Sequence, residues 1–311
     1  MAEVFEETSP ERVSGVKRIN ISIVIPAYNE QDGLGRVLED LCRLMEENEF
    51  LKEIIVVDDA SDDSTADVAD RQERVVVLRH RGNRGYGAAL KTGIRHAQHD
   101  LICITDADGT YPHKRIPDLV DRMQREGWDM VIGARTGEKV AIPLLRRPAK
   151  WVLGRLASFV AGEPILDLNS GLRIFRKESA VRWFNMLPDG FSFTTTITLA
   201  MLTNGYLVGY VPINYHARIG RSKIRPIRDT LGFFQLVLKM ALYFAPLKVF
   251  LSLSVMLLLL AISWGLYSTF VLGALADVST LIIASAGIQT AMTGMLAELI
   301  NRRLPNNYRG K

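Results

Sequence analysis

Cysteine is scarce in this chain: its 311 residues include only Cys42 and Cys103. A small secreted domain stapled by disulfides is therefore excluded, and both thiols lie in apolar stretches where burial is expected. A large excess of one charge is lacking as well, since 38 basic and 34 acidic residues leave a net charge of +4. So small an excess does not by itself indicate nucleic-acid binding. Hydrophobic residues are plentiful, and their share of 48% excludes a disordered chain.

Charged residues are missing altogether from two long segments near the C-terminus. Residues 249–276 contain none, and after Asp277 residues 278–297 contain none either. About 20 apolar residues are enough to cross a bilayer as a helix. We therefore expect two transmembrane helices that form a hairpin with a break near residues 273–279. A pair of buried core helices is the alternative, although such helices are usually shorter and carry a polar face.

Positive charges set the expected orientation of this hairpin. Lys248 precedes the first span, and only Asp277 lies in the connection. Four basic residues follow the second span: Arg302, Arg303, Arg309 and Lys311. Because loops rich in Lys and Arg stay in the cytoplasm, we expect a two-span membrane protein whose large N-terminal domain lies on the cytoplasmic face. Residues 1–17 hold no apolar signal-peptide core.

The stretch before the hairpin mixes apolar and charged residues. Large apolar side chains recur there at helical spacing, at Leu231, Phe234, Leu238 and Leu242. This pattern predicts an amphipathic helix in the membrane surface, with an ordinary docked helix as the alternative. The expected order along the chain is a flexible N-terminus, an α/β catalytic domain, an interfacial helix, a transmembrane hairpin and a cytoplasmic tail, at residues 1–18, 19–225, 226–246, 247–300 and 301–311.

Apolar strands alternate with helices in the first half of the chain, and Pro26 is expected to end the first strand. This alternation indicates an α/β fold with a mainly parallel sheet flanked by helices. Ligands of such sheets bind beyond the carboxyl ends of the strands, where polar clusters occur at residues 26–30, 58–59 and 106–108. Strands are predicted at residues 19–25, 53–57, 75–78, 101–105 and 130–132, and helices at 31–45 and 88–97.

Two of these clusters are acidic. Asp106 and Asp108 directly follow an apolar strand, so both carboxylates can reach one hard cation such as Mg²⁺ or Mn²⁺. A cation held there would neutralise a diphosphate leaving group. Asp-X-Asp alone is also a frequent turn. Asp58 and Asp59 could accept hydrogen bonds from a ribose hydroxyl or a base, or else cap a helix.

Basic residues indicate where phosphates would bind. Arg84 lies in a glycine-rich turn that lacks the dinucleotide fingerprint, which disfavours a nicotinamide enzyme, and it could contact a phosphate or a base. Two clusters of basic residues follow later in the chain: Arg135, Arg146, Arg147, Lys150 and Arg155, and then Arg218, Arg221, Lys223, Arg225 and Arg228. They could be attracted to anionic lipid headgroups, or they could bind the phosphate of a lipid substrate, and the two explanations are compatible.

Several segments resemble one known family, the family 2 glycosyltransferases with the Rossmann-like GT-A fold. They run from Ile23 to Glu30, Val56 to Thr65, Asn83 to Gly93 and Thr105 to Gly109. The segments from Asp167 to Arg173 and from Arg218 to Lys223 narrow the resemblance to dolichol-phosphate mannosyltransferases and polyprenyl-phosphate glycosyltransferases. The resemblance covers about residues 19–240, and the hairpin is similar to that of membrane-anchored members.

The resemblance implies a role for particular residues. The nucleotide site would be lined by Pro26, Tyr28, Glu30 and Asp58, near Arg84. Asp106 and Asp108 would hold the divalent cation and would form the catalytic set with Arg135 and Arg218. The acceptor phosphate would meet Arg135, Arg146, Arg147, Lys150, Arg218 and Lys223, where residues 146–150 depart from the family's spacing. The sugar or acceptor region would include Asp167, Ser170 and Arg173.

The expected reaction is inverting transfer of a sugar from a UDP- or GDP-linked donor to dolichyl or undecaprenyl phosphate, with Mg²⁺ or Mn²⁺ as cofactor. A lipid phosphate is already anionic and needs no general base, which agrees with five histidines that show no ligand or triad spacing. A processive polysaccharide synthase is a rival, but its Gln-X-X-Arg-Trp motif is absent. A non-catalytic membrane module that recruits partners is another, and a homo-oligomer is left open.

Overall fold

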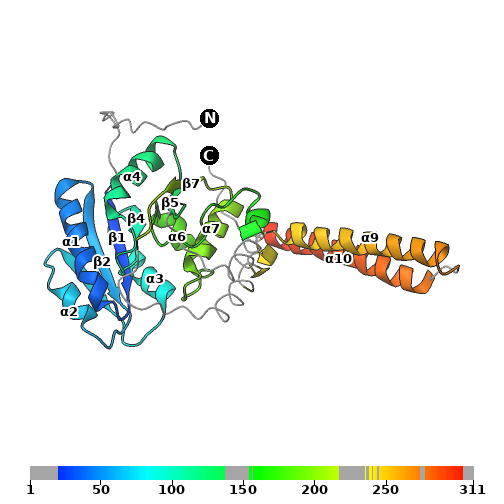
Figure 1. The fold of residues 1–311 in the computed structure, drawn as a ribbon, viewed down its shortest axis with the longest axis horizontal. Coiled ribbons are helices and arrows are strands. Elements are labelled where there is room, and N and C mark those ends of the chain that lie inside the picture. Colours follow the sequence, from blue (N-terminus) through cyan, green and yellow to red (C-terminus); the bar gives the residue numbers. More distant parts are fainter. Residues whose placement is uncertain are drawn as a thin grey trace.

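The computed structural model shows an α/β domain from which a two-helix hairpin projects (Figure 1). It describes residues 20–136, 154–155, 157–216, 235, 238–239, 241–243, 245–273 and 277–303. The domain contains a seven-stranded sheet in the order β3-β2-β1-β4-β6-β5-β7. Every pairing is parallel except those of β6 with β4 and β5. The strands are β1 (Ile21–Ala27), β2 (Leu51–Asp58), β3 (Val75–Arg79), β4 (Leu101–Ile104), β5 (Met130–Ala134), β6 (Arg173–Arg176) and β7 (Val208–Pro212).

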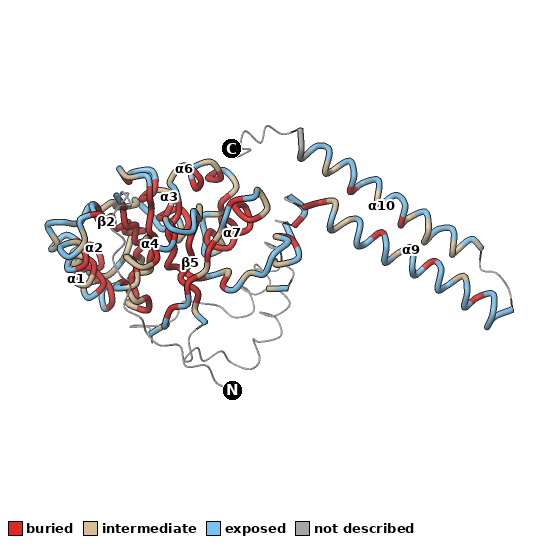
Figure 2. The backbone as a smooth tube through the Cα atoms, turned by 90° about the horizontal axis from the view of Figure 1, so that it is seen from above, coloured by how far each residue is buried: buried red, intermediate tan, exposed pale blue. Residues whose placement is uncertain are grey.

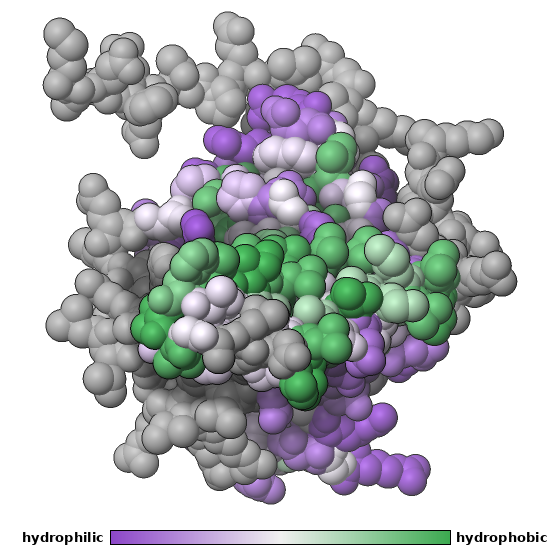
Figure 3. All heavy atoms as spheres, turned by 90° about the vertical axis from the view of Figure 1, so that its right-hand side faces the viewer, coloured by the Kyte–Doolittle hydropathy of each residue, from purple (hydrophilic) through white to green (hydrophobic). Residues whose placement is uncertain are grey.

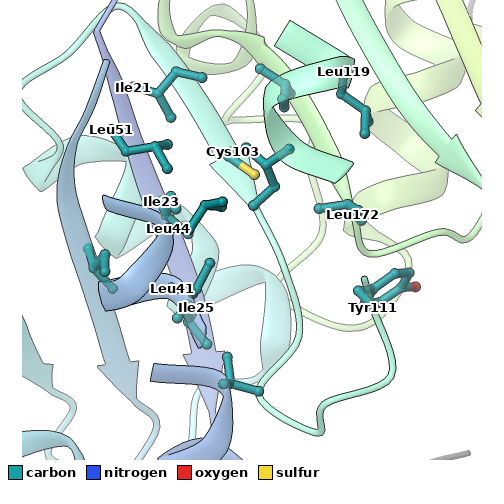
Figure 4. Packing of buried hydrophobic residues seen from close by; sticks show 14 of the residues in the cluster. Ile21, Ile23, Ile25, Leu41, Leu44, Leu51, Cys103, Tyr111, Leu119 and Leu172 are labelled. Carbon is teal, nitrogen blue, oxygen red and sulfur yellow. The ribbon is translucent and has the colours of Figure 1, made fainter. Parts of the chain in front are cut away.

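Helices cover both faces of this sheet. On one face, Ile21, Ile23 and Ile25 of β1 pack in a buried cluster with the apolar sides of α1 and α4 (Figure 4). The alternate residue Val24 points to the other face and packs with α3, α6 and α7. The expected α/β class, a mainly parallel sheet flanked by helices, is confirmed. The helices are α1 (Gln31–Glu47), α2 (Thr65–Asp70), α3 (Tyr86–His96), the 3₁₀ turn η1 (His113–Arg115), α4 (Ile116–Arg125), α6 (Lys177–Arg182) and α7 (Phe193–Thr203).

Pro26 does not end the first strand, and that expectation was wrong. It continues in β1 and pairs with Val57 of β2. The backbone oxygen of Val24 accepts a hydrogen bond from the Thr105 N–H on the β4 side. The backbone N–H and C=O groups of alternate residues point to the same neighbouring strand, so the backbone nitrogen of Pro26 also points to the β4 side. The hydrogen-bonded ladder with β4 ends before it, at the pair of Val24 with Ile104. The missing N–H of proline therefore removes no ladder hydrogen bond.

The sequence did not predict β6 and β7. Strand β6 begins with Arg173, which is completely buried, so its pattern does not read as an apolar strand. In β7, Gly209 packs directly against the Trp128 ring and only Gly209 and Val211 are buried. Because β6 is antiparallel to β4, its first residue lies opposite Ile104, at the edge of the sheet where β4 ends.

The hairpin consists of α9 (Pro246–Phe270) and α10 (Asp277–Arg303). Residues 246–270 and 278–300 are long and apolar enough to cross a membrane, with mean hydropathies of 2.3 and 1.4. In the most apolar 18-residue window of each span only 11% of the residues are buried (Figure 2), which disfavours the alternative of buried core helices. Figure 3, which views the side where the hairpin projects, shows hydrophobic residues gathered across the middle of that face.

The helices of the hairpin contact each other closely at small residues. A Cβ added at Gly294 would lie 2.5 Å from the Cβ of Phe250. Near the turn, the Trp264 Nε1–H donates to Ser279 Oγ at 2.8 Å. At its base, Val249 packs with the buried side chains of Val160, Ala241 and Ala245. Most of the predicted interfacial helix at 226–246 lies outside the described residues.

Candidate active site

The carboxyl ends of β1, β2, β4 and β5 meet at one edge of the sheet, together with the start of β6. The loops that follow β1 and β2 are joined by hydrogen bonds. Asn29 N–H donates to Ser61 Oγ at 2.9 Å, and Glu30 N–H donates to Thr65 Oγ1 at 2.8 Å. The backbone of Asn29 is left-handed, with φ of 51°. The segment from Pro26 to Glu30, which includes Tyr28, is thus held against the loop that follows Asp58.

The two adjacent aspartates at the end of β2 have different surroundings, although both are buried. Asp58 Oδ1 accepts a hydrogen bond from the Ser61 N–H at 3.3 Å. Asp59 instead accepts from the backbone N–H groups of Arg84 and Gly85, at 2.9 and 2.7 Å. His80 Nδ1 contacts the same Asp59 carboxylate at 2.6 Å. Asp59 therefore shapes the turn that carries the exposed Arg84, a role that the sequence did not reveal.

Asp106 and Asp108 lie at the end of β4, as predicted. The Tyr86 hydroxyl donates to Asp106 Oδ1 at 2.9 Å, and the Thr110 hydroxyl donates to Asp108 Oδ1 at 2.7 Å. Gly33 of α1 packs under this turn, since a Cβ there would lie 2.8 Å from the Ala107 oxygen. Burial, and then the charge of Asp106, raise the pKa of Tyr86 well above its usual value, so this phenol stays a protonated donor.

The described residues contain no group of three or more His, Cys, Asp and Glu side chains arranged to hold a metal ion. The site can therefore offer a cation the two carboxylates of Asp106 and Asp108. Mg²⁺ and Mn²⁺ bind well to so few carboxylates when phosphate oxygens and water complete their coordination. This donor set fits a cation that arrives with a diphosphate better than a permanently enclosed metal site.

Arg135 and Asp167 form a bidentate ion pair at the end of β5. Arg135 donates from Nε and Nη2 to the two carboxylate oxygens, at 2.8 and 2.9 Å. Burial alone would raise the pKa of Asp167, but the hydrogen bonds and charge of Arg135 outweigh it and lower that pKa. The Arg135 guanidinium also lies over the Tyr215 ring, 5.4 Å from its centroid. Asp167 thus binds the Nε–Nη2 edge of the guanidinium, Tyr215 lies against one of its faces, and Nη1 lies outside the bidentate contact.

Ser170 and Arg173 are placed inside the protein rather than on its surface. The Ser170 hydroxyl donates to the Gly133 oxygen at 2.6 Å. Arg173 donates to the backbone oxygens of Ser170 and Thr194 and to the Thr198 hydroxyl. Both side chains therefore hold the loop 167–171 against β5 and α7. The predicted phosphate contacts Arg146, Arg147, Lys150, Arg218 and Lys223 lie outside the described residues.

Three aromatic side chains of this edge were not predicted from the sequence. Tyr86 contacts Asp106, and the Tyr111 oxygen accepts a hydrogen bond from the Gly171 N–H at 2.6 Å. Phe191, which is 67% exposed, stacks on Tyr86 with ring centroids 5.5 Å apart. The glycines on either side of Tyr86 were the available signal, since glycine permits the close backbone approach that the loop at residues 188–191 makes there.

Comparison with known proteins decides the family. The model of glycosyl transferase family 2 matches residues 22–184. The chain belongs to glycosyl transferase family 2. A dolichyl-phosphate hexose transferase of Haloferax volcanii is 30% identical to this family 2 glycosyltransferase over 72% of the chain and 94% of the relative. A dodecaprenyl-phosphate galacturonate synthase of Rhizobium johnstonii is 27% identical over 95% of the chain and 93% of the relative.

Residues 245–302 of this glycosyltransferase match the model of the GtrB C-terminal hairpin. Together with the two apolar, exposed helices, this match indicates that the enzyme is anchored in a membrane. Among solved structures, a glucosyl-3-phosphoglycerate synthase of Mycobacterium tuberculosis in complex with Mn²⁺, UDP and phosphoglyceric acid is similar, with a TM-score of 0.57. It is 21% identical and covers 72% of this chain and 78% of its own, so it supports the GT-A fold.

Proposed function

We propose that this glycosyltransferase moves one sugar, with inversion, from a UDP- or GDP-linked donor to dolichyl or undecaprenyl phosphate. The observation that carries the proposal is the presence, in one chain, of the Asp106–Asp108 edge and the hairpin. The relatives named for dolichyl and dodecaprenyl phosphate support the choice of acceptor. An enzyme anchored at the membrane also keeps its site near a lipid substrate.

The proposed reaction is a single displacement. A phosphate oxygen of the acceptor attacks the anomeric carbon of the sugar, and the bond from that carbon to the donor diphosphate breaks. The electron pair of the broken bond leaves with the nucleoside diphosphate. The acceptor oxygen already carries negative charge, so the enzyme has no proton to remove. Its tasks are alignment of the two reactants and stabilisation of the leaving group.

Asp106 and Asp108 would hold the divalent cation, Mg²⁺ or Mn²⁺. When bound, this cation neutralises charge on the departing diphosphate. The crystallised synthase of Mycobacterium tuberculosis contains Mn²⁺ together with UDP, which supports the assignment. Pro26, Tyr28, Glu30, Asp58 and Arg84 would form the nucleotide side of the site.

Arg135 would bind the acceptor phosphate. Asp167 binds Nε and Nη2, which fixes the plane of the guanidinium, and Nη1, which lies outside this contact, would donate to a phosphate oxygen. Asp167 and Ser170 would act through this orientation. We assign the remaining phosphate contacts to the basic residues at 146–150 and 218–223, and we place the catalytic domain on the cytoplasmic face because the hairpin is flanked by basic residues.

A membrane assay tests this function. Membranes that contain the full chain are given radiolabelled UDP- and GDP-sugars in turn, with dolichyl or undecaprenyl phosphate, and the lipids are extracted. We expect label from one donor to enter the lipid fraction in a metal-dependent way. Asp108→Asn should lower this transfer at least about a hundredfold, because it removes one of two carboxylate ligands. Asp100→Asn, an exposed aspartate just before β4, is the matched control and should retain activity.

Three outcomes would contradict the proposal. Full activity of Asp108→Asn without divalent cations would remove the proposed metal site. Label that enters a water-soluble polymer would favour a processive synthase. An absence of transfer with every donor, alongside no binding of UDP or GDP in the presence of Mn²⁺, would favour a non-catalytic module.

A further inference from the structure

The carboxylate of Asp106 is confined from two sides. The Tyr86 hydroxyl donates to its Oδ1 at 2.9 Å. Gly171 lies on another side, where an added Cβ would come within 2.6 Å of Oδ2 and 2.7 Å of Oδ1. The Gly171 backbone is itself held, because its N–H donates to the Tyr111 oxygen. Asp106 therefore has one oxygen oriented by Tyr86 and little room to turn away from it.

Tyr86 is in turn fixed by a loop from a distant part of the chain. The loop at residues 188–191 lies against the turn that starts α3: a Cβ on Gly87 would lie 2.2 Å from the Pro188 oxygen. The Ala88 N–H donates to the Asp189 oxygen at 3.1 Å, and Lys91 forms an ion pair with the Asp189 carboxylate at 2.7 Å. These contacts hold α3 and the loop together as one unit.

Phe191 completes this unit. It directly follows the docked backbone and stacks on Tyr86 with an interplanar angle of 23°. Most of the Phe191 ring is exposed, so its burial contributes little to the core. The ring on which it stacks is the one whose hydroxyl orients Asp106. The stack of Phe191 on the Tyr86 ring, together with the docking of the loop on the start of α3, therefore limits the movement of Tyr86.

We propose that Tyr86 is a positioning residue for the metal-binding carboxylate of Asp106, and that Phe191 holds Tyr86 in place. This inference rests on the proposed function, because it assumes that Asp106 is a cation ligand. Partners that orient a ligating carboxylate by hydrogen bonding commonly contribute about ten- to a hundredfold to metal affinity. The role differs from ligation, since the Tyr86 hydroxyl donates its hydrogen bond to the carboxylate oxygen.

The test measures Mn²⁺ binding directly, from the electron paramagnetic resonance signal of free Mn²⁺, with full-length protein in detergent and UDP or GDP present. Tyr86→Phe keeps the ring and the stack but removes the hydroxyl. We expect it to raise the Kd for Mn²⁺ about tenfold and to raise the Mn²⁺ concentration for half-maximal transfer equally. The thermal midpoint should stay close to that of the wild type.

Two further variants separate positioning from general damage. Tyr210→Phe is the matched control, because the Tyr210 hydroxyl is buried without a hydrogen-bond partner among the described residues. It should leave Mn²⁺ binding unchanged. Phe191→Leu should weaken Mn²⁺ binding in the same direction as Tyr86→Phe but less strongly, whereas Phe191→Tyr, which preserves the stack, should bind as the wild type does.

The outcomes distinguish this inference from the proposed function. Tyr86→Phe with an unchanged Kd, in a protein whose wild type binds Mn²⁺ with a nucleoside diphosphate, would overturn the positioning role alone. A wild type that binds no Mn²⁺ with either diphosphate would overturn both the metal site and the role of Tyr86. An equal loss in Tyr86→Phe and Tyr210→Phe would also refute the positioning role, since it would show that any buried phenol matters.

Discussion

At the scale of single residues, Arg173 shows how the site is built on buried polar contacts. Its guanidinium is completely buried and donates to two backbone oxygens and one hydroxyl. Burial therefore lowers the pKa of this arginine. Such a group is costly to bury, and the hydrogen bonds offset that cost. Its position beneath residues 167–171 makes Arg173 part of the support of the site.

Removal of Arg173 should destabilise the domain. Arg173→Met leaves the oxygens of Ser170 and Thr194 buried without this donor, and we expect a loss of about 2–4 kcal/mol in unfolding free energy. Denaturant or thermal unfolding of the detergent-solubilised protein measures it. Arg176→Met, at the exposed end of the same strand, is the control and should change stability by less than about 0.5 kcal/mol. Equal effects of the two variants would refute the supporting role.

The Arg135–Asp167 pair gives a prediction about the acceptor. A lysine cannot reproduce the bidentate contact that orients the guanidinium. Arg135→Lys should therefore raise the KM for polyprenyl phosphate about tenfold or more, while the KM for the nucleotide sugar stays within about twofold. Steady-state kinetics with each substrate varied in turn measures both. A change confined to the nucleotide sugar would place Arg135 on the donor side instead.

At the scale of elements, the docking of the loop 188–191 on the start of α3 joins two parts of the candidate site. Gly87→Ala forces a Cβ to within 2.2 Å of the Pro188 oxygen, so the loop must move. We expect a loss of about 1–3 kcal/mol in stability together with weaker Mn²⁺ binding. Gly82→Ala lies in the same turn but has no atom within 4 Å of the added Cβ, and it should behave as the wild type.

The strands that the sequence predicted are those with continuous apolar runs. Residues 21–25 and 54–57 are completely buried, so their apolar composition indicates strands, and the polar clusters that follow them mark the edge that carries the candidate site. Strand β6 was missed because a buried arginine interrupts the apolar pattern. The candidate site shows the same limit: Asp59 and Tyr86 act through contacts with residues distant in sequence, which spacing alone does not show.

At the scale of the whole molecule, a two-helix hairpin with exposed apolar side chains projects from the α/β domain that carries the candidate site. The mean charge and hydropathy of the chain conceal this division, because the apolar residues are concentrated at the C-terminal end. The fold of the domain is shared with the glucosyl-3-phosphoglycerate synthase of Mycobacterium tuberculosis, which was crystallised with phosphoglyceric acid. The hairpin is therefore the feature that directs this site to a lipid acceptor in our proposal.

The most direct test of that proposal is the chemical identity of the product. Full-length protein in lipid nanodiscs is given polyprenyl phosphate and the donor selected by the membrane assay, and the extracted lipid is analysed by mass spectrometry while the released nucleotide is quantified. We predict a lipid that carries one sugar and one phosphate, with one nucleoside diphosphate released per product. A lipid with two phosphates and release of a nucleoside monophosphate, or no lipid product at all, would contradict sugar transfer to a polyprenyl phosphate.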